Sequence, residues 1–437
     1  MGNTISYEAT EHKLDFGDGK GSITGLQYDK KARRYAGTIC PQAAYMSAKK
    51  IDTPKEAFSE DYLRLHLWTP VESAKDKKWP VMLWLHGGWF QMGGPSHKPG
   101  MDPTELISTG NLNVVVVAIG YRLNLFGFLA GDALQAENGS AEAVRENIAR
   151  FGGDVQNVIL AGRSAGAYAI HAHAMYEFQN PAFSAASPSS HRLVMMSNAI
   201  PAQPKTPAEC QDQFDELSGI AAQNKIKKLV DAIMKLKNHT FRPVTDSSFI
   251  QPGMMDYHRN GTFAKEFKKR NFKILIGEML NEETLYAATN GPEANVDSLR
   301  LQVSNYYAPV TTSRVLKHYK LPTTGEKSDW TALCGHIISD CQVRAISRFL
   351  ANSIFSNSVE IKDIWRFSIM HGPTEQELVL MKEWIRDLVA FVGAENDHRY
   401  GPKEIDEFKV ATPEGKIEIQ KDPRWKELLE LADVFSG

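Results

Sequence analysis

The stretch Val158-Ile-Leu-Ala-Gly-Arg-Ser-Ala-Gly-Ala-Tyr168 decides the fold of this 437-residue chain. Four apolar residues lead into Gly162-Arg-Ser-Ala-Gly166, and small and apolar residues follow, which predicts a strand, a tight turn and a helix with a serine at the apex. The two glycines leave room where the turn brings strand and helix together, and the strained turn exposes the Ser164 hydroxyl. The Ala165 N–H then lies at the start of a helix, where it can donate to an oxyanion. The stretch therefore predicts a nucleophilic serine at the end of a buried strand.

Alternating strands and helices surround this turn. Two short apolar runs, Val81–Leu85 and Val114–Ile119, are typical of strands buried on both faces of a sheet. Residues 101–110 and 141–151 have the length and composition of helices between such strands. This alternation predicts a parallel sheet with right-handed crossovers. The predicted fold class is α/β, with a central, mostly parallel sheet flanked by helices.

The flanking regions give weaker patterns. Alternation of apolar and other residues in Asp61–Trp68 predicts a half-buried strand. Beyond residue 200, apolar runs predict strands at 273–277 and 364–370, and helical patterns cover 210–238, 329–353 and 375–391. Repeats and clear linkers are missing from the sequence. We therefore predict a single domain over residues 1–437, with helical insertions at roughly 203–270 and 285–355.

Charge and cysteine content restrict the class of partner. The 50 basic and 52 acidic residues give a net charge of −2, which does not suggest a nucleic-acid ligand. The first residues lack the apolar core of a signal peptide, no run of 18 apolar residues occurs, and the four cysteines are scattered, so we expect a cytoplasmic protein without stable membrane insertion. Met1-Gly-Asn-Thr-Ile-Ser6 fits the N-myristoylation rule at Gly2, but a plain flexible start explains it as well.

A second motif supplies what a serine nucleophile needs. A neutral serine requires a general base, a carboxylate that orients the base, and donors for the oxyanion. Leu85-His-Gly-Gly-Trp-Phe90 follows a predicted buried strand, and its adjacent glycines allow backbone N–H groups to face an incoming carbonyl. A simple Gly-Gly turn is the alternative interpretation. Two such motifs in the order that a hydrolase requires favour an oxyanion loop.

With these motifs the chain resembles the type-B carboxylesterase family, the α/β-hydrolases that include the cholinesterases. The resemblance is dense over roughly residues 59–200. Besides the serine turn and the oxyanion loop, it rests on three segments: Ser59-Glu-Asp-Tyr-Leu-Arg-Leu-His-Leu-Trp-Thr-Pro70, Gly120-Tyr-Arg-Leu-Asn-Leu-Phe-Gly-Phe-Leu129 and Glu146-Asn-Ile-Ala-Arg-Phe-Gly-Gly-Asp154. It implies the α/β-hydrolase fold, with the chain as a shortened, intracellular member.

The resemblance also implies the roles of individual residues. Ser164 corresponds to the nucleophile, and the backbone N–H groups of Gly88, Trp89 and Ala165 correspond to the oxyanion hole. The acid lies in Ile274-Leu-Ile-Gly-Glu-Met-Leu-Asn-Glu-Glu-Thr284, where Glu282 matches best and Glu283 and Glu278 are rivals. Ser197 stands where the family has a serine that supports the acid.

The base has two candidates. His371, in His371-Gly372 after a predicted strand, fits the family's histidine best, and the order Ser, Glu, His is the one this fold requires. The apolar stretch that normally follows is missing, so His336 is the second candidate. His86 is expected to shape the oxyanion loop.

Two departures concern the substrate. Arg163 stands where the family has a glutamate before the nucleophile, and it forms either an outward salt bridge or a contact to a substrate carboxylate or phosphate. Trp89 replaces the third glycine of the oxyanion loop, keeps its N–H, and is expected to present its ring to substrate.

The resemblance implies a serine carboxylic-ester hydrolase that acts through an acyl-enzyme on a small-molecule ester or lactone, with no metal or cofactor. One alternative is a lactone or amide hydrolase, or an acyltransferase, of secondary or detoxification metabolism on the same fold. The other is a non-catalytic cholinesterase-like binding protein, against which the presence of Ser164 argues.

Overall fold

The computed structural model describes residues 9–15, 22–28, 32–35, 40–42, 63–71, 78–95, 102–131, 148–180, 192–222, 229–289, 291–369, 375–393, 398–412 and 414–435. The first residues, including Gly2, and residues 370–374, including His371, lie outside these ranges.

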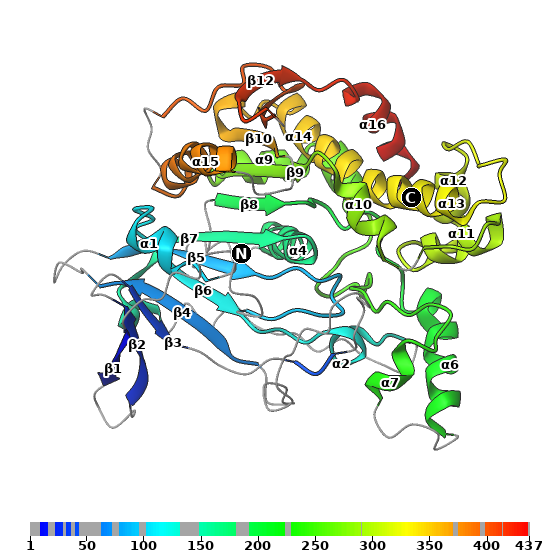
Figure 1. Cartoon of the computed structure of the whole chain (residues 1–437), viewed down its shortest axis with the longest axis horizontal. Helices are drawn as coiled ribbons and strands as arrows, with labels where there is room; N and C mark the ends of the chain where they lie inside the picture. The colour runs from blue at the N-terminus through cyan, green and yellow to red at the C-terminus, as the bar shows by residue number, and fades with distance from the viewer. Residues whose placement is uncertain are drawn as a thin grey trace.

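A twelve-stranded sheet organises the described residues (Figure 1). The strand order is β1-β2-β3-β4-β6-β5-β7-β8-β9-β10-β11-β12. Strands β6 through β11 run parallel in this order, whereas β1 to β4 and β12 pair antiparallel with their neighbours. The strands are β1 Ala9–Asp15, β2 Ser22–Tyr28, β3 Ala32–Tyr35, β4 Leu65–Pro70, β5 Trp79–Leu85, β6 Val115–Ile119, β7 Gly153–Arg163, β8 Arg192–Met196, β9 Lys273–Met279, β10 Ile364–Ile369, β11 Glu407–Ala411 and β12 Ile417–Lys421.

Helices cover both faces of the sheet and gather beyond one end of its strands, the end toward which the arrow of β8 points in Figure 1. The α-helices are α1 Thr104–Ser108, α2 Asn124–Phe128, α4 Ala165–Gln179, α6 Gln211–Ala222, α7 Val230–Ile233, α8 Met254–Arg259, α9 Thr262–Lys269, α10 Glu282–Ala287, α11 Val296–Ser304, α12 Pro309–Leu316, α13 Lys327–Ser339, α14 Ala345–Ser356, α15 Glu375–Gly393 and α16 Trp425–Ala432. Short 3₁₀ turns are η3 Ile148–Phe151, η4 Ala208–Cys210, η6 Ile361–Asp363 and η7 Asp433–Phe435, and η5 Asp340–Arg344 is a π-helical turn.

The central strands are buried on both faces, as predicted for parallel strands. In β5, Val81 and Leu83 belong to one buried cluster, which includes residues of α4 and α14, while Met82 belongs to a second cluster with residues of α1 and α15. Strand β6 divides its side chains in the same way. The apolar runs are therefore strands because each side chain, whichever face it points to, finds an apolar layer.

The strand predicted at 61–68 differs from expectation. Strand β4 begins only at Leu65, and from His66 to Pro70 every residue is buried, so it is not half-buried. It pairs with β3 on one side and β6 on the other, and Leu67 and Trp68 enter the two opposite clusters. The alternation of residue types misled because His66, a polar residue within the predicted strand, is buried.

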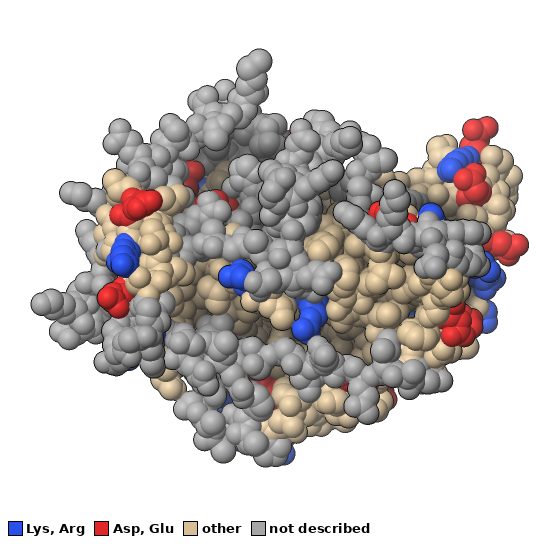
Figure 2. Space-filling model, turned by 90° about the horizontal axis from the view of Figure 1, so that it is seen from below, with Lys and Arg blue, Asp and Glu red and all other residues tan. Residues whose placement is uncertain are grey.

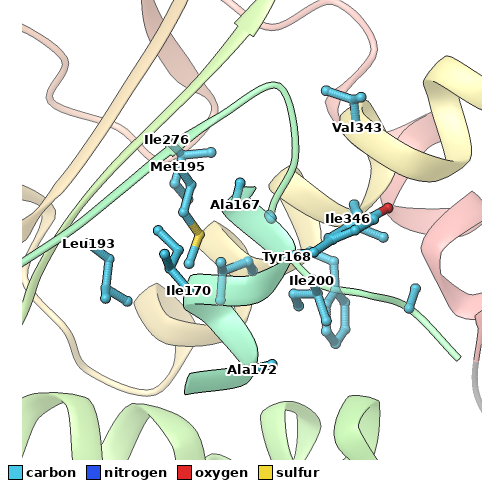
Figure 3. Close-up of a cluster of buried hydrophobic side chains, with 14 of the residues drawn as sticks. Ala167, Tyr168, Ile170, Ala172, Leu193, Met195, Ile200, Ile276, Val343 and Ile346 are labelled. Atoms are coloured by element: carbon cyan, nitrogen blue, oxygen red, sulfur yellow. The ribbon is translucent and has the colours of Figure 1, made fainter. Parts of the chain in front are cut away.

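Helix α4 carries the serine turn and is held by apolar contacts along its length. Figure 3 shows Tyr168 and Ile170 of α4 between Leu193 and Met195 of β8 and Val343 and Ile346 from the opposite side. All of these side chains are at least 90% buried. The start of the helix is therefore fixed relative to β8 and to the helical layer beyond it.

The strand order places the reversal point of the sheet between β5 and β7. From β5 the chain crosses to β6 on one side, whereas from β7 it proceeds to β8 and β9 on the other. In open α/β sheets, ligand sites form outside the carboxyl ends of the strands at such a reversal. The predicted oxyanion loop, residues 86–90, follows β5 and the serine turn follows β7, so both motifs lie at this point.

Candidate active site

Ser164 lies in a strained backbone conformation between β7 and α4. Its φ is 55° and its ψ is −120°, a combination that L-residues rarely adopt and that is typical of functional turns. A Cβ on Gly162 would lie 2.5 Å from the carbonyl carbon of Gly166, and a Cβ on Gly166 would overlap the Leu85 carbonyl oxygen. Both glycines are thus required by close packing of strand, turn and helix. The Ala165 N–H is the first of α4 and therefore has no partner within the helix, which leaves it available.

The oxyanion loop lies directly against this turn. A Cβ on Gly87 would be 2.8 Å from the Arg163 carbonyl oxygen and 3.1 Å from Ser164 Cβ. Gly88, Trp89 and Phe90 all have positive φ, at 122°, 56° and 65°. The Gly88 carbonyl accepts from the N–H groups of Gln91 and Met92, at 2.8 and 3.0 Å. This turn therefore uses the carbonyl of Gly88, not its N–H.

His86 is fixed in this loop by contacts to Gly87 and Tyr121. It is 1% exposed and stacks on Tyr121 with ring centroids 4.3 Å apart. Its Nδ1 lies 2.8 Å from the Gly87 carbonyl oxygen, and the Tyr121 hydroxyl donates to the His86 carbonyl at 2.6 Å.

Backbone hydrogen bonds continue across the carboxyl ends of four parallel strands. Ser164 N–H donates to the Met196 carbonyl at 2.7 Å, and Ser197 N–H donates to the Gly277 carbonyl at 2.7 Å. Leu280 N–H donates to the Ile369 carbonyl at 2.9 Å. The turns after β7, β8 and β9 and the end of β10 are therefore held side by side.

The three acidic candidates have different partners. Glu278 forms a bidentate ion pair with Arg348, and Glu283 pairs with Arg344 at 2.5 Å. Glu282 is 5% exposed; its Oε1 accepts from the Met279 N–H at 2.8 Å, and its carboxylate is also hydrogen-bonded to the Ser197 side chain. Burial raises the pKa of Glu282 above its usual value, although these two hydrogen bonds oppose the rise. Among the described residues, Glu282 is thus the one of the three carboxylates whose hydrogen bonds include no arginine.

Of the histidine candidates, only His336 is described. It is exposed on α13, near enough to Glu283 to lower the pKa of that carboxyl. His371 lies outside the described residues, two positions after Ile369, the last residue of β10.

The chain matches the model of the Carboxylesterase family over residues 27–359. The chain belongs to this family. It is 30% identical to an uncharacterized esterase/lipase of Schizosaccharomyces pombe, over 92% of this chain and 85% of the relative. It is 28% identical to a carboxylic ester hydrolase of Gibberella moniliformis, over 90% and 83%. This carboxylesterase is accordingly a carboxylic ester hydrolase.

Solved structures agree on the fold. PNB esterase superposes with a TM-score of 0.71 at 18% identity, covering 97% of this chain and 100% of that one. Aspergillus niger EstA gives a TM-score of 0.70 at 14% identity, covering 95% and 96%. The esterase therefore has the α/β-hydrolase fold.

Two adjoining pockets flank the oxyanion loop of the carboxylesterase. The first is lined by Trp89, whose ring meets Tyr286 edge-to-face with centroids 6.3 Å apart. The second is lined by Phe90 and by Tyr168, one turn beyond Ser164 on α4. Both are lined by Thr240, Asn305 and Tyr306, so they share a wall.

Arg163, a candidate from the sequence, is exposed at the end of β7, and its guanidinium forms no ion pair with another described residue.

The structure also shows two residues that sequence reasoning missed. Arg242 and Lys205 line the second pocket and lie in proline-containing segments that match no motif. Only the three-dimensional structure brings these two cations together in one pocket.

Metal and membrane sites receive no support from the described part of the chain. There, no group of three or more His, Cys, Asp or Glu side chains is placed to hold a metal ion. None of the helices within the described ranges combines the length and apolar character needed to cross a membrane. On the described part of the face seen in Figure 2, basic and acidic side chains are interspersed.

Proposed function

We propose that Ser164, His371 and Glu282 form a catalytic triad and that the esterase works through an acyl-enzyme. The single observation that carries this proposal is the strained Ser164 backbone at the reversal point of the sheet, directly against Gly87. Four adjacent parallel strands lead in order to Ser164, Ser197, Glu282 and His371, which is the chain order that this fold uses.

Each residue has one chemical task in this mechanism. Ser164 Oγ attacks the ester carbonyl while His371 takes its proton, and the N–H groups of Gly88, Trp89 and Ala165 hold the oxyanion. His371 then protonates the departing alcohol. Water attacks the acyl-enzyme with His371 as base, and the carboxylic acid leaves. Glu282 orients His371 and stabilises its charged form.

The partners of the acidic residues support Glu282 over its rivals. Arg344 and Arg348 already compensate the charges of Glu283 and Glu278. The burial that raises the pKa of Glu282 makes its carboxylate a strong partner for an imidazolium. For the base, the backbone bond from Leu280 to Ile369 supports His371, because it joins the end of β10 to the loop before Glu282.

We further propose that Trp89 and Arg163 contact a small-molecule ester. Trp89 lines the first pocket, and Arg163 is exposed beside the nucleophile. Cys210, Cys334 and Cys341 are free and buried, which supports a reducing compartment, and we propose the cytoplasm.

We propose that residues 1–437 form one catalytic domain. The twelve strands belong to one sheet, and the proposed insertions at 203–270 and 285–355 contribute α6 to α9 and α11 to α14.

Covalent labelling with a fluorophosphonate probe tests the triad. We expect labelling and hydrolysis of 4-nitrophenyl esters in the wild type and in His336→Ala, and loss of both in Ser164→Ala and His371→Ala. Labelling that survives in His371→Ala and disappears in His336→Ala would assign the base to His336.

A further inference from the structure

The second pocket contains two cations close to the oxyanion loop. Arg242 and Lys205 are both half-buried and both line it, and no Asp or Glu belongs to its described lining. Within the described ranges neither side chain forms an ion pair, and Lys205 and Arg242 donate to the uncharged oxygens of Ser304 and Gln342. Two unpaired cations in one partly desolvated pocket repel each other and favour an anion between them.

The Arg242 backbone is fixed to the oxyanion loop. The Gln91 side chain is fully buried and forms two hydrogen bonds with the backbone of Phe241, the residue that precedes Arg242. Its Nε2 donates to the Phe241 carbonyl, and its Oε1 accepts from the Phe241 N–H at 3.0 Å. The same Nε2 donates to the Trp89 carbonyl at 2.9 Å. Since Trp89 is a proposed oxyanion donor, Arg242 is held at a defined position relative to the reacting carbonyl.

The guanidinium of Arg242 is surrounded by rings. It lies over Phe90, Tyr168 and Tyr306, at 6.0, 5.5 and 5.0 Å from their centroids. Its Nη2 donates to Gln342 Oε1 at 2.8 Å, the same oxygen that accepts from the Tyr168 hydroxyl at 2.6 Å. The guanidinium is also hydrogen-bonded to the Tyr168 side chain, and it has five N–H donors in a planar fork. The remaining donors suit a carboxylate.

Lys205 is the second cation of the pocket and lies close enough to the positive charge of Arg242 to be affected by it. Its Nζ donates to the Ser304 carbonyl at 2.7 Å. Burial lowers the pKa of Lys205, and the positive charge of Arg242 lowers it further, while Cys210 and Glu209 act in the opposite direction. Glu209 is exposed, and its carboxylate accepts hydrogen bonds from Thr206.

We infer that the pocket of Arg242 and Lys205 binds an anionic group of the substrate, so that the enzyme prefers esters that carry a carboxylate. This inference rests on the proposed function, because the pocket is lined by Phe90 of the proposed oxyanion loop and by Tyr168 of the helix that follows Ser164. It names Arg242 and Lys205 as specificity residues that no motif identifies.

Paired substrates test it. Monomethyl glutarate and methyl valerate differ by a carboxylate on the acyl side, and 4-acetoxybutanoate and butyl acetate differ by a carboxylate on the alcohol side. Released methanol or acetate gives kcat/KM for each ester, and the ratio of anionic to neutral ester measures the preference. We expect a ratio above one for one pair, and a fall of at least tenfold in Arg242→Gln and in Lys205→Gln, since hydrogen bonds to charged groups are strong. Arg242→Lys restores part of the ratio because it keeps the charge.

Arg300→Gln, which removes an exposed arginine of α11, is the matched control and should leave the ratio unchanged. Fluorophosphonate labelling of Ser164 reports whether each variant retains an assembled site, and if Arg242→Gln does not, Lys205→Gln carries the test. A wild type without preference in either pair, or variants whose ratio equals that of the wild type, would overturn the inference. Hydrolysis of the neutral esters by Ser164→Ala would instead refute the proposed mechanism.

Discussion

The substitution Ser197→Ala tests whether the hydrogen bond from Ser197 stabilises the carboxylate of Glu282, the proposed acid. Ser197 follows β8, its N–H is bound to the Gly277 carbonyl, and its side chain is hydrogen-bonded to the Glu282 carboxylate. The substitution removes that one bond and leaves the donor Met279 N–H in place. A hydrogen bond to a charged group contributes about 2 kcal/mol, and each 1.4 kcal/mol corresponds to about tenfold. Because Glu282 is 5% exposed, little water can replace the hydroxyl. We expect kcat/KM to fall about thirtyfold.

The direction of the pH effect follows from the same bond. The hydroxyl stabilises the ionised carboxylate, so its loss raises the pKa of Glu282 further above its ordinary value. Activity requires the ionised form, and the acidic limb of kcat/KM against pH therefore moves to higher pH. Initial rates on a 4-nitrophenyl ester across the acidic range measure both effects.

Ser368→Ala is the matched control. Ser368 is 1% exposed on β10, next to β9, and its Oγ has no hydrogen-bond partner among the described residues. The same deletion there should change neither the rate nor the limb. If Ser197→Ala behaves like Ser368→Ala, Ser197 does not support the acid and the assignment of Glu282 loses its main structural argument.

Three further predictions follow from buried contacts. Gly166→Ala places a methyl group against the Leu85 carbonyl and should cost about 3 kcal/mol and most of the activity, whereas Gly219→Ala, with nothing within 4 Å in α6, should gain about 0.5–1 kcal/mol; urea titration compares them. Glu282→Gln should lower kcat about 10⁴-fold and Glu283→Gln by less than about threefold, since only the former loses the orienting carboxylate; equal losses in steady-state assays would contradict this. Burial lowers the pKa of His171 from 6.5 to about 3 and that of its partner His258 well below 6.5, so the unfolded chain binds these protons first; the free energy of unfolding should fall as pH drops below 6.5, by up to about 1.4 kcal/mol per unit for each histidine, and His171→Leu with His258→Leu should flatten this dependence in urea titrations at pH 7, 6 and 5.

Local sequence predicted the features that local geometry determines. The serine turn requires Gly162 and Gly166 because strand, turn and helix meet within a few residues, so a short motif carries the information. The strands at 81–85, 273–277 and 364–370 were predicted for a similar reason, since burial on both faces demands continuous apolar runs, and they correspond to β5, β9 and β10. The hairpin of β11 and β12 was not predicted, because β12 is largely exposed and shows no apolar run.

Long-range partners determined what the sequence left open. Glu278, Glu282 and Glu283 are almost neighbours in the chain, and they are distinguished by their partners. Glu283 binds Arg344, which is 61 residues away, and Glu278 binds Arg348, which is 70 residues away. Arg242 is likewise 100 residues from Gln342. No spacing rule connects such pairs, so the cationic pocket had no signal in the sequence.

The π-helical turn η5 explains how one helical segment contacts both the loop before Glu282 and the pocket of Arg242. The pattern of residues 329–353 predicted a continuous helix, and the structure inserts a wider turn at Asp340–Arg344 between α13 and α14. From this turn Gln342 reaches Tyr168 and Arg242, while Arg344 donates to the Leu280 carbonyl at 3.0 Å and pairs with Glu283. Such turns interrupt regular helices frequently at functional sites. The same turn binds the loop before Glu282 through Arg344 and the guanidinium of Arg242 through Gln342. The position of the proposed acid and the position of the positive charge in the pocket therefore depend on one element.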